Sequence, residues 1–585
     1  MTKPMKFENE QAIGRVSMVE TMRVFIDVDN HDLLKTIMVG NLISVQGATG
    51  NQYLISIVER VSRLPIESGL LEDENEGSVD STPQMKDTIR CTLVGTYWNK
   101  FGDYGPRFKR GADSNPQIDQ LCFVIHDENL SAFMNVLSLD IDESKALVLG
   151  HFALNPDAAA IADGDRFFQR HAAILGSTGS GKSYTVASIL EKASKLDNPN
   201  IILLDMHGEY SSLAKEEPNG YCEYFRIAGP GDLAAPKENV IFLPYWLLNR
   251  EEMLSMILDR SDDNAPNQAS RFTAIVLEKK REKLSGGQFD SLRSTFTVDS
   301  PIPYDLGELV SQLEADDQDR GINPATGKEK NGPWNGKLTR FISRLDAKKN
   351  DRRYGFLFTP PTAYNAMEWL EEFAVTFMTT TIDGRSGIKI VDFSEVPSDV
   401  LPTVVSVFAR LLYDIQFWMT PSARTPVCLA CDEAHLYLPV RADADAAEKR
   451  ALETFERIAK EGRKYGFSLL VVSQRPSDVS KTILSQCNNF ISLRLTNDQD
   501  QAAVKAVMPD SMAGIAEILP LLDVGEAIIL GDAILLPSRI KLAEPTAKPK
   551  SLTKRFWKEW TEKPSDSDAI RAAVRALRKQ SRESI

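Results

Sequence analysis

The first 150 residues consist of short stretches in which apolar and polar positions alternate, separated by segments rich in turn-forming residues. Alternation with a period of two is typical of strands that have one buried face. We expect strands at 22–28, 37–46, 53–61, 88–96, 120–126 and 146–152. Their spacing predicts a small N-terminal β-barrel or sandwich. Residues 67–80 carry six acidic and no basic side chains, which predicts an exposed hairpin loop without a catalytic role.

From about residue 170 the pattern changes to continuous apolar runs separated by stretches of helical periodicity. The runs lie at 171–175, 200–205, 388–393, 427–432, 468–473, 490–495 and 526–530. Runs rich in Val, Ile and Leu that alternate with helices are typical of a parallel sheet covered on both faces. The sequence therefore predicts an α/β domain after the barrel.

Three further features divide the chain. Between 230 and 387 the apolar runs fade, and helical periodicity at 250–260, 267–283 and 336–351 predicts a helical insertion. After residue 545 the last 40 residues hold eleven Lys and Arg against five Asp and Glu, with an amphipathic helix expected at 567–580. We therefore expect a barrel at 1–153, an α/β domain at 154–545 with an insertion at about 231–387, and a basic arm at 546–585.

The strongest chemical signal is a complete G-x-x-x-x-G-K-[ST] phosphate loop at 176–183. A short apolar run precedes the loop, and a stretch with helical periodicity follows it. Backbone N–H groups at the N-terminus of that helix can therefore surround a triphosphate. Lys182 is expected to reach the β and γ phosphates, and Ser183 to bind Mg²⁺, which implies ATP and Mg²⁺ as cofactors. The residues predicted to bind the nucleotide are Gly176, Ser177, Thr178, Gly179, Ser180, Gly181, Lys182, Ser183 and Tyr184.

Two later strands end in polar side chains suited to hydrolysis. The run 427–431 is followed by Asp432 and Glu433, which could hold Mg²⁺ and polarise the attacking water, respectively. The run 469–473 is followed by Gln474, a candidate sensor of the γ-phosphate. The alternatives are an ordinary acidic strand end and a glutamine that only caps its strand.

Hydrolysis by phosphate-loop ATPases often needs an arginine from a neighbouring subunit. Arg463 and Arg170 are the candidates, and a surface salt bridge is the alternative for each. We interpret the isolated His207 and His435 as structural, while Glu209 is a weaker candidate for a position near the nucleotide.

The net charge limits how the protein could bind nucleic acid. The chain has 585 residues, with 68 Lys and Arg against 82 Asp and Glu, a net charge of −14. This argues against a wholly basic nucleic-acid coat, so DNA contacts would have to be local. One candidate is 336–355, with seven basic and two acidic side chains, for which a solvated helix face is the alternative.

The six cysteines have no framework spacing, and we interpret Cys428 and Cys431, which lie in an apolar run, as core thiols rather than a metal site. We therefore expect reduced thiols and a cytoplasmic protein. The sequence shows neither a signal peptide nor 18 consecutive apolar residues, so no membrane association is expected.

Taken together, five segments resemble the HerA branch of the HerA/FtsK translocase ATPases over about residues 10–545. They are GSTGSGKS, DMHGEY, the stretch from Val391 to Trp418, ACDEAHLYLP, and IAKEGRKYGFSLLVVSQRPSDVS. The resemblance implies a HAS-barrel, a RecA-like P-loop NTPase core, and a ring of six subunits around double-stranded DNA that ATP turnover drives. It implies Lys182 and Ser183 for nucleotide and Mg²⁺, Asp432 for the metal, and Asp432 and Glu433 for hydrolysis. It also implies Gln474 as sensor and Arg463 and Arg170 at the subunit interface.

The resemblance implies partners as well. Members of the family work with nucleases, and bacterial members similar to this chain are paired in antiphage defence with a sirtuin-like NAD-consuming effector or another nuclease. Tails beyond the core can brace the neighbouring subunit, which suits the arm at 546–585. The alternative is a ring ATPase that assembles and regulates an effector without moving DNA. A protein-remodelling ATPase ranks last, because the sequence shows no matching lid domain.

Overall fold

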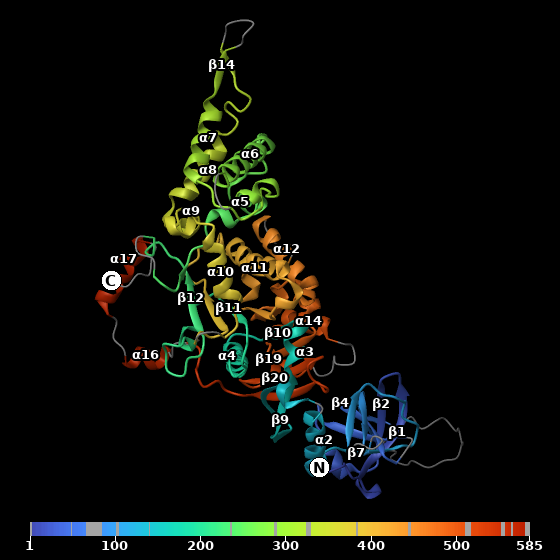
Figure 1. Cartoon of the computed structure of the whole chain (residues 1–585). Helices are drawn as coiled ribbons and strands as arrows, with labels where there is room; N and C mark the ends of the chain where they lie inside the picture. The colour runs from blue at the N-terminus through green and yellow to red at the C-terminus, as the bar shows by residue number, and fades with distance from the viewer. Residues whose placement is uncertain are drawn as a thin grey trace, which may run out of the picture. The chain divides into compact units, whose positions relative to one another are not determined.

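The computed structural model describes residues 3–47, 50–65, 85–100, 105–139, 141–233, 237–285, 289–322, 329–381, 384–440, 442, 446–508, 516–550, 556–562 and 566–579. The acidic segment 67–80 lies outside these residues. The chain forms two compact units, which are described separately (Figure 1). Unit 1 comprises Met1–Lys192, Ser473–Ser477 and Cys487–Pro545, and unit 2 comprises Ala193–Val472, Asp478–Gln486 and Thr546–Ile585.

Unit 1 begins with a closed antiparallel barrel, as predicted, but the strand Ala12–Glu20 was not predicted and the strand expected at 37–46 comprises only Leu42–Gln46. Its six strands pair in the circular order β1-β7-β3-β4-β5-β2, and β2 closes the ring onto β1. A short seventh strand, β6 (Arg107–Arg110), extends the sheet beside β5. The barrel strands are β1 (Ala12–Glu20), β2 (Arg23–Val28), β3 (Leu42–Gln46), β4 (Gln52–Pro65), β5 (Met85–Trp98) and β7 (Leu121–Val124).

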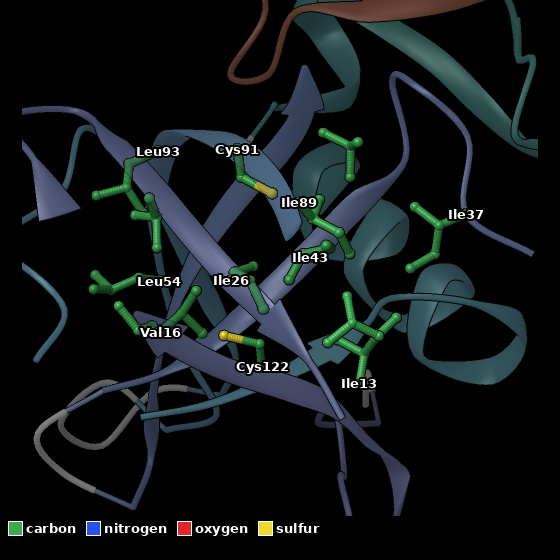
Figure 2. Close-up of a cluster of buried hydrophobic side chains, with 14 residues drawn as sticks. Ile13, Val16, Ile26, Ile37, Ile43, Leu54, Ile89, Cys91, Leu93 and Cys122 are labelled. Carbon is green, nitrogen blue, oxygen red and sulfur yellow. The ribbon is translucent and has the colours of Figure 1, made fainter. Parts of the chain in front are cut away.

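Side chains from all six strands fill the barrel (Figure 2). Alternate residues of each strand point inward, which is the period-two pattern that the sequence displays. The cluster also contains the thiols of Cys91 and Cys122, both fully buried. Burial raises the pKa of the Cys91 thiol to about 12, so it stays protonated and behaves as a small apolar side chain.

The rest of unit 1 is a second sheet, with the strand order β10-β19-β20-β21-β8-β9. Only β10 and β19 are parallel, and the other neighbours are antiparallel. The strands are β8 (Ala146–Phe152), β9 (Asn155–Asp163), β10 (Ala172–Leu175), β19 (Asn489–Leu493), β20 (Glu526–Gly531) and β21 (Ser538–Leu542). The helices α2 (Asp127–Leu139), α3 (Gly164–Gln169), α4 (Lys182–Ala193) and α14 (Asp498–Val507) also belong to this unit.

Two predicted strands are present in this sheet, but the partners of one and the direction of the other were predicted wrongly. The strand at 146–152 exists, but it pairs with β9 and β21 and not with the barrel. The run at 526–530 is a strand that lies antiparallel to both neighbours, so the sheet is not parallel throughout. Alternation of apolar residues predicts a buried face but does not specify the partner strand, because pairing depends on the rest of the fold.

Unit 2 contains the parallel sheet that the apolar runs predicted, with the order β13-β12-β16-β11-β17-β18. Because the strands are parallel, their carboxyl ends share one edge. The strands are β11 (Ile201–Asp205), β12 (Glu223–Ile227), β13 (Val240–Ile241), β16 (Ile388–Asp392), β17 (Val427–Cys431) and β18 (Phe467–Ser473). Its helices include α11 (Leu401–Trp418), α12 (Ala446–Glu461) and α13 (Lys481–Gln486).

The segment predicted to be a helical insertion is mainly helical. It contains α5 (Arg250–Ile257), α6 (Ala265–Lys283), α7 (Leu306–Gln318), α8 (Thr339–Asn350), α9 (Gly355–Phe358) and α10 (Glu368–Met378). The short strands β13, β14 (Arg320–Ile322) and β15 (Glu329–Asn331) were not predicted. Arg410 of α11 donates two hydrogen bonds to the buried carboxylate of Glu252 in α5, at 2.7 and 2.8 Å, which fixes α5 against α11.

The C-terminal arm contains α16 (Phe556–Glu562) and the predicted amphipathic helix, α17 (Ser567–Lys579). Just before them the chain is hydrogen-bonded to the loop that follows β11. The N–H of Lys550 donates to the carbonyl of Glu209 at 2.7 Å, and the Ser212 hydroxyl donates to the carbonyl of Lys548 at 2.7 Å. Among the helices in the described ranges, none combines the length and the apolar character needed to span a bilayer.

Candidate nucleotide-binding site

The phosphate loop connects the carboxyl end of β10 to the first turn of α4, as predicted. The Gly176 N–H donates to the carbonyl of Ser473 at 3.2 Å, and the Ser177 N–H donates to the carbonyl of Arg494 at 2.8 Å. A Cβ at Gly176 would lie 2.6 Å from the Ser180 hydroxyl oxygen, so no side chain fits there. The loop is therefore held against the ends of its neighbouring strands.

Two further glycines of the loop have a left-handed backbone. Gly179 has φ of 76° and Gly181 has φ of 108°, a region that other residues rarely adopt. After these glycines, the first turn of α4 has backbone N–H groups for which the helix offers no carbonyl acceptor. These groups and the helix dipole favour a bound anion. Lys182, the first residue of α4, is largely buried against this loop.

Gln474 contacts the phosphate loop directly. The Thr178 hydroxyl donates to its side-chain carbonyl oxygen, Oε1, at 2.6 Å. Gln474 follows β18 at once, so its position is fixed by the end of that strand. The structure thus places the predicted sensor residue against the loop, in contact with a side chain that the motif leaves unspecified.

In unit 2 the paired acids Asp432 and Glu433 follow the carboxyl end of β17. Both are buried, with exposed fractions of 4% and 9%. Glu433 has a left-handed backbone, with φ of 45°, and such strain in a residue other than glycine is common at functional sites. Its Oε2 lies 3.3 Å from Nδ1 of His435, and the Tyr437 hydroxyl donates to the carbonyl of Asp432 at 3.0 Å.

Asp432 is surrounded by negative charge. Burial raises the pKa of its carboxyl well above the usual value, and the carboxylates of Glu433, Asp205 and Glu209 raise it further. A divalent cation would relieve this repulsion, so the donor set fits Mg²⁺. Within the described ranges no three His, Cys, Asp or Glu side chains could hold a metal ion alone. Mg²⁺ often takes only one or two carboxylates, with bound phosphates as further ligands.

The loop after β11 is organised by Asp205, whose role the sequence reasoning missed. One oxygen of its carboxylate accepts N–H groups from His207, Gly208 and Glu209 at 3.2, 2.8 and 3.2 Å, and the other accepts that of Tyr210 at 3.0 Å. Burial nevertheless raises the pKa of Asp205 to about 6. An acid that ends a strand and precedes a glycine-containing turn is a signal that could have revealed this arrangement.

These contacts also place the weaker candidates. The acidic side chain of Glu209 acts electrostatically on Asp432, in agreement with a position near the hydrolytic acids. His207 contributes its backbone N–H to the loop. Cys428 and Cys431 are buried and form no disulfide bond, and the same holds for the other four cysteines.

Both candidate arginines lie at the amino ends of strands, away from the carboxyl ends that carry the chemistry. Arg170 lies before β10, with five residues between it and the phosphate loop, and β10 alone is ~13 Å long. It forms an ion pair with Asp532. Arg463 precedes β18 and is exposed, whereas Asp432 follows the parallel neighbour β17. Neither arginine is therefore placed beside the chemical groups of its own unit.

Four of the seven basic side chains in the stretch 336–355 lie within ion-pair distance of a carboxylate. Arg344 pairs with Asp259 at 3.0 Å, Lys348 with Asp399 at 3.0 Å and Arg353 with Asp351 at 2.6 Å. Arg340 lies 3.9 Å from Asp262, a weaker contact. These pairs favour the solvated helix face over a free cationic surface for DNA.

Glu433→Gln is expected to lower kcat for ATP hydrolysis by about 10²- to 10⁴-fold, because the amide cannot accept a proton from the attacking water. Nucleotide affinity should change little, since Gln keeps the size of the side chain. The check is steady-state turnover together with equilibrium binding. Glu209→Gln, a neighbouring acid, is the matched control. A larger loss of turnover in that variant would assign the base to Glu209 instead.

Comparison with known proteins agrees with this geometry. A model of the HerA helicase central domain matches residues 147–412, and a model of the HerA-like C-terminal region matches 373–578. A probable helicase of Methanocaldococcus jannaschii is 28% identical over 400 residues, which cover 68% of this chain and 66% of the relative. The DNA double-strand break repair helicase HerA of Saccharolobus solfataricus is 28% identical over 388 residues, covering 64% of each chain. The chain thus spans slightly less than two thirds of either relative.

One relative and one solved structure extend the comparison. A second probable helicase of M. jannaschii is 21% identical, and the match covers 91% of this chain and 96% of the relative. The structure of VirB4 of Thermoanaerobacter pseudethanolicus aligns with a TM-score of 0.46 and 18% identity, covering 69% of this chain and 98% of that one.

The architecture is that of a RecA-like P-loop NTPase core preceded by a barrel. The glycine loop between β10 and α4, the acids after β17 and the glutamine after β18 are its defining parts. Since the two HerA models together match residues 147–578, the chain belongs to the HerA helicase family.

Proposed function

We propose that the protein is an ATP-hydrolysing ring motor that moves along, or pumps, double-stranded DNA. The observation that carries the proposal is the complete phosphate loop, with Gln474 hydrogen-bonded to Thr178 within it. Such a contact allows a side chain on a strand end to sense whether the loop holds a nucleoside triphosphate. The HerA helicase relatives support coupling of that chemistry to DNA.

The proposed roles of the residues follow from their chemistry. Lys182 neutralises the β and γ phosphates, and Glu433 takes a proton from the attacking water. Ser183 supplies a hydroxyl and Asp432 a carboxylate for Mg²⁺, which would neutralise charge on the phosphates. Gln474 reports the γ-phosphate to β18. The buried position of Asp432 among other acids is what supports its role toward the cation.

A role of the two arginines in hydrolysis would require a ring of subunits. Arg463 and Arg170 lie at strand ends opposite to the acids and to the phosphate loop of their own units. An arginine in such a position can complete hydrolysis only in a neighbouring subunit. We propose six subunits, as in the family that the motifs resemble.

We further propose that the motor works in the cytoplasm with a separate effector, either a nuclease or a sirtuin-like NAD-consuming enzyme, in antiphage defence. The six buried cysteines form no disulfide bond, which is compatible with a reducing compartment. The effector and the defence role are inferred from the resemblance of the motifs to bacterial members of the family.

ATP turnover is expected to rise when long duplex DNA is added, and the stimulation is expected to fade steeply as salt increases. The reason is that phosphate contacts release counterions, so affinity falls as a power of the salt concentration. The measurement is steady-state ATP hydrolysis with and without duplex DNA across a salt series. Single-stranded DNA of equal nucleotide content is the control for duplex specificity. An ATP turnover rate that is the same with and without DNA at every salt concentration would contradict the proposal of a DNA motor.

A second candidate is a ring ATPase that assembles and regulates an effector without moving DNA. The pairing of Arg344, Lys348 and Arg353 with acids favours it, because these charges are already neutralised. This candidate predicts DNA-independent turnover that changes when the effector is added. The same assay therefore separates the two.

A further inference from the structure

Two exposed apolar side chains lie on a loop of unit 1 that contacts the phosphate loop. Leu521 ends a short 3₁₀ turn (Leu519–Leu521), and Val524 follows three residues later. Their exposed fractions are 78% and 50%, whereas Leu519 and Leu522 of the same loop are buried. Apolar surface of this kind costs free energy unless something covers it.

The loop is fixed against the phosphate loop by its backbone. The Gly525 N–H donates to the carbonyl of Ser180 at 3.1 Å. A Cβ at Gly181 would lie 3.6 Å from the Cα of Gly525, so the two backbones are in van der Waals range. Gly525 itself has φ of 74°, a left-handed conformation that permits this approach.

The strand β21 holds the other side of the loop. The Leu542 N–H donates to the carbonyl of Gly525 at 2.9 Å, and the Lys541 ammonium donates to the carbonyl of Val524 at 2.7 Å. Leu521 and Val524 are therefore carried by a loop that is anchored beside the phosphate loop, not by a free tail. Preorganised apolar side chains next to a few polar anchors are the usual composition of a small-ligand site.

We propose that Leu521 and Val524 form the platform on which the base of the bound nucleotide packs. This inference rests on the proposed function, because it takes the phosphates of that nucleotide to lie in the loop at 176–183. The phosphate loop binds the phosphates of the nucleotide through N–H groups and charge. The platform covers one apolar face of the base. The ligand in turn shields the two exposed side chains from water.

Such a platform has a consequence for specificity. Aliphatic side chains contact the face of a base and do not read its hydrogen-bonding edge, so they discriminate weakly between purines. Loss of the platform should therefore weaken the binding of ATP and the binding of GTP to a similar degree. Inorganic tripolyphosphate, which has no base, should bind as before.

The experiment is to measure binding of ATP, GTP and tripolyphosphate, each with Mg²⁺, to the wild-type chain and to Leu521→Ser/Val524→Ser. We expect the double variant to bind both nucleotides about tenfold or more weakly, in line with the burial of one or two aliphatic side chains. Tripolyphosphate affinity should be unchanged. Leu196→Ser, at a residue 56% exposed that follows α4, is the matched control.

The outcomes separate this inference from the proposed function. If the wild-type chain binds neither ATP nor tripolyphosphate, the proposed nucleotide site is wrong, and the proposed platform is wrong as well. Wild-type binding of ATP with an unchanged double variant would overturn the platform alone. An equal loss of tripolyphosphate, or unchanged nucleotide binding with altered self-association, would also overturn it, since the surface would then support the phosphate loop or face a second copy.

Discussion

Lys182→Ala is expected to abolish ATP turnover while the fold stays intact. Alanine retains the helical start of α4 but removes the one cation that the motif places on the β and γ phosphates. Without it the negative charge that develops during phosphoryl transfer is poorly compensated, and nucleotide affinity falls as well. The measurement is steady-state hydrolysis over a range of ATP concentrations, with circular dichroism and thermal unfolding to verify the fold.

Lys192→Ala is the matched control for this variant, because it removes a lysine from the last turn of the same helix. It should hydrolyse ATP at close to the wild-type rate. An unchanged rate in Lys182→Ala would mean that the loop at 176–183 is not the catalytic phosphate site, and the function proposed here would fall with it.

Arg463→Ala is expected to reduce hydrolysis by about 10³- to 10⁵-fold and to leave nucleotide binding and assembly in place. The reason is that an arginine supplied by a neighbour stabilises the transition state and contributes little to binding of the ground state. Lys464→Ala removes an exposed positive charge one residue away and serves as the control. Loss of nucleotide binding in Arg463→Ala would contradict the interface role.

Mixing two inactive variants tests directly whether Arg463 acts on a neighbour. An Arg463→Ala subunit keeps its own Glu433, and a Glu433→Gln subunit keeps its own Arg463. In a mixed ring the second can complete the site of the first, so turnover should reappear on mixing. If Arg463 served its own subunit, the mixture would stay as inactive as its components.

The local chemistry was predictable because it depends on residues that are close in sequence. The phosphate loop, its flanking strand and helix, and the acids after β17 are each encoded within about ten residues, and the structure has them as expected. The barrel was predictable for a related reason: alternation along each strand already defines its buried face.

What the sequence did not reveal depends on contacts between distant segments. The strand at 146–152 pairs with β21, nearly 400 residues away, and no local pattern encodes that choice. The contact of Gly525 with Ser180 is made by backbone atoms, so it requires no distinctive side chain. The partly neutralised basic stretch was misleading for a similar reason, since acids such as Asp259 and Asp399 are remote from it in sequence.

The hydrogen bonds at the root of the C-terminal arm have a consequence for truncated variants. Lys550 and Lys548 are bound to the loop that Asp205 caps, and Glu209 of that loop acts on Asp432. One of these contacts joins two backbone groups, one comes from the Ser212 hydroxyl and one goes to the Asp205 carboxylate. Removing the chain from residue 548 onward would therefore also remove two hydrogen bonds from the loop that carries Glu209.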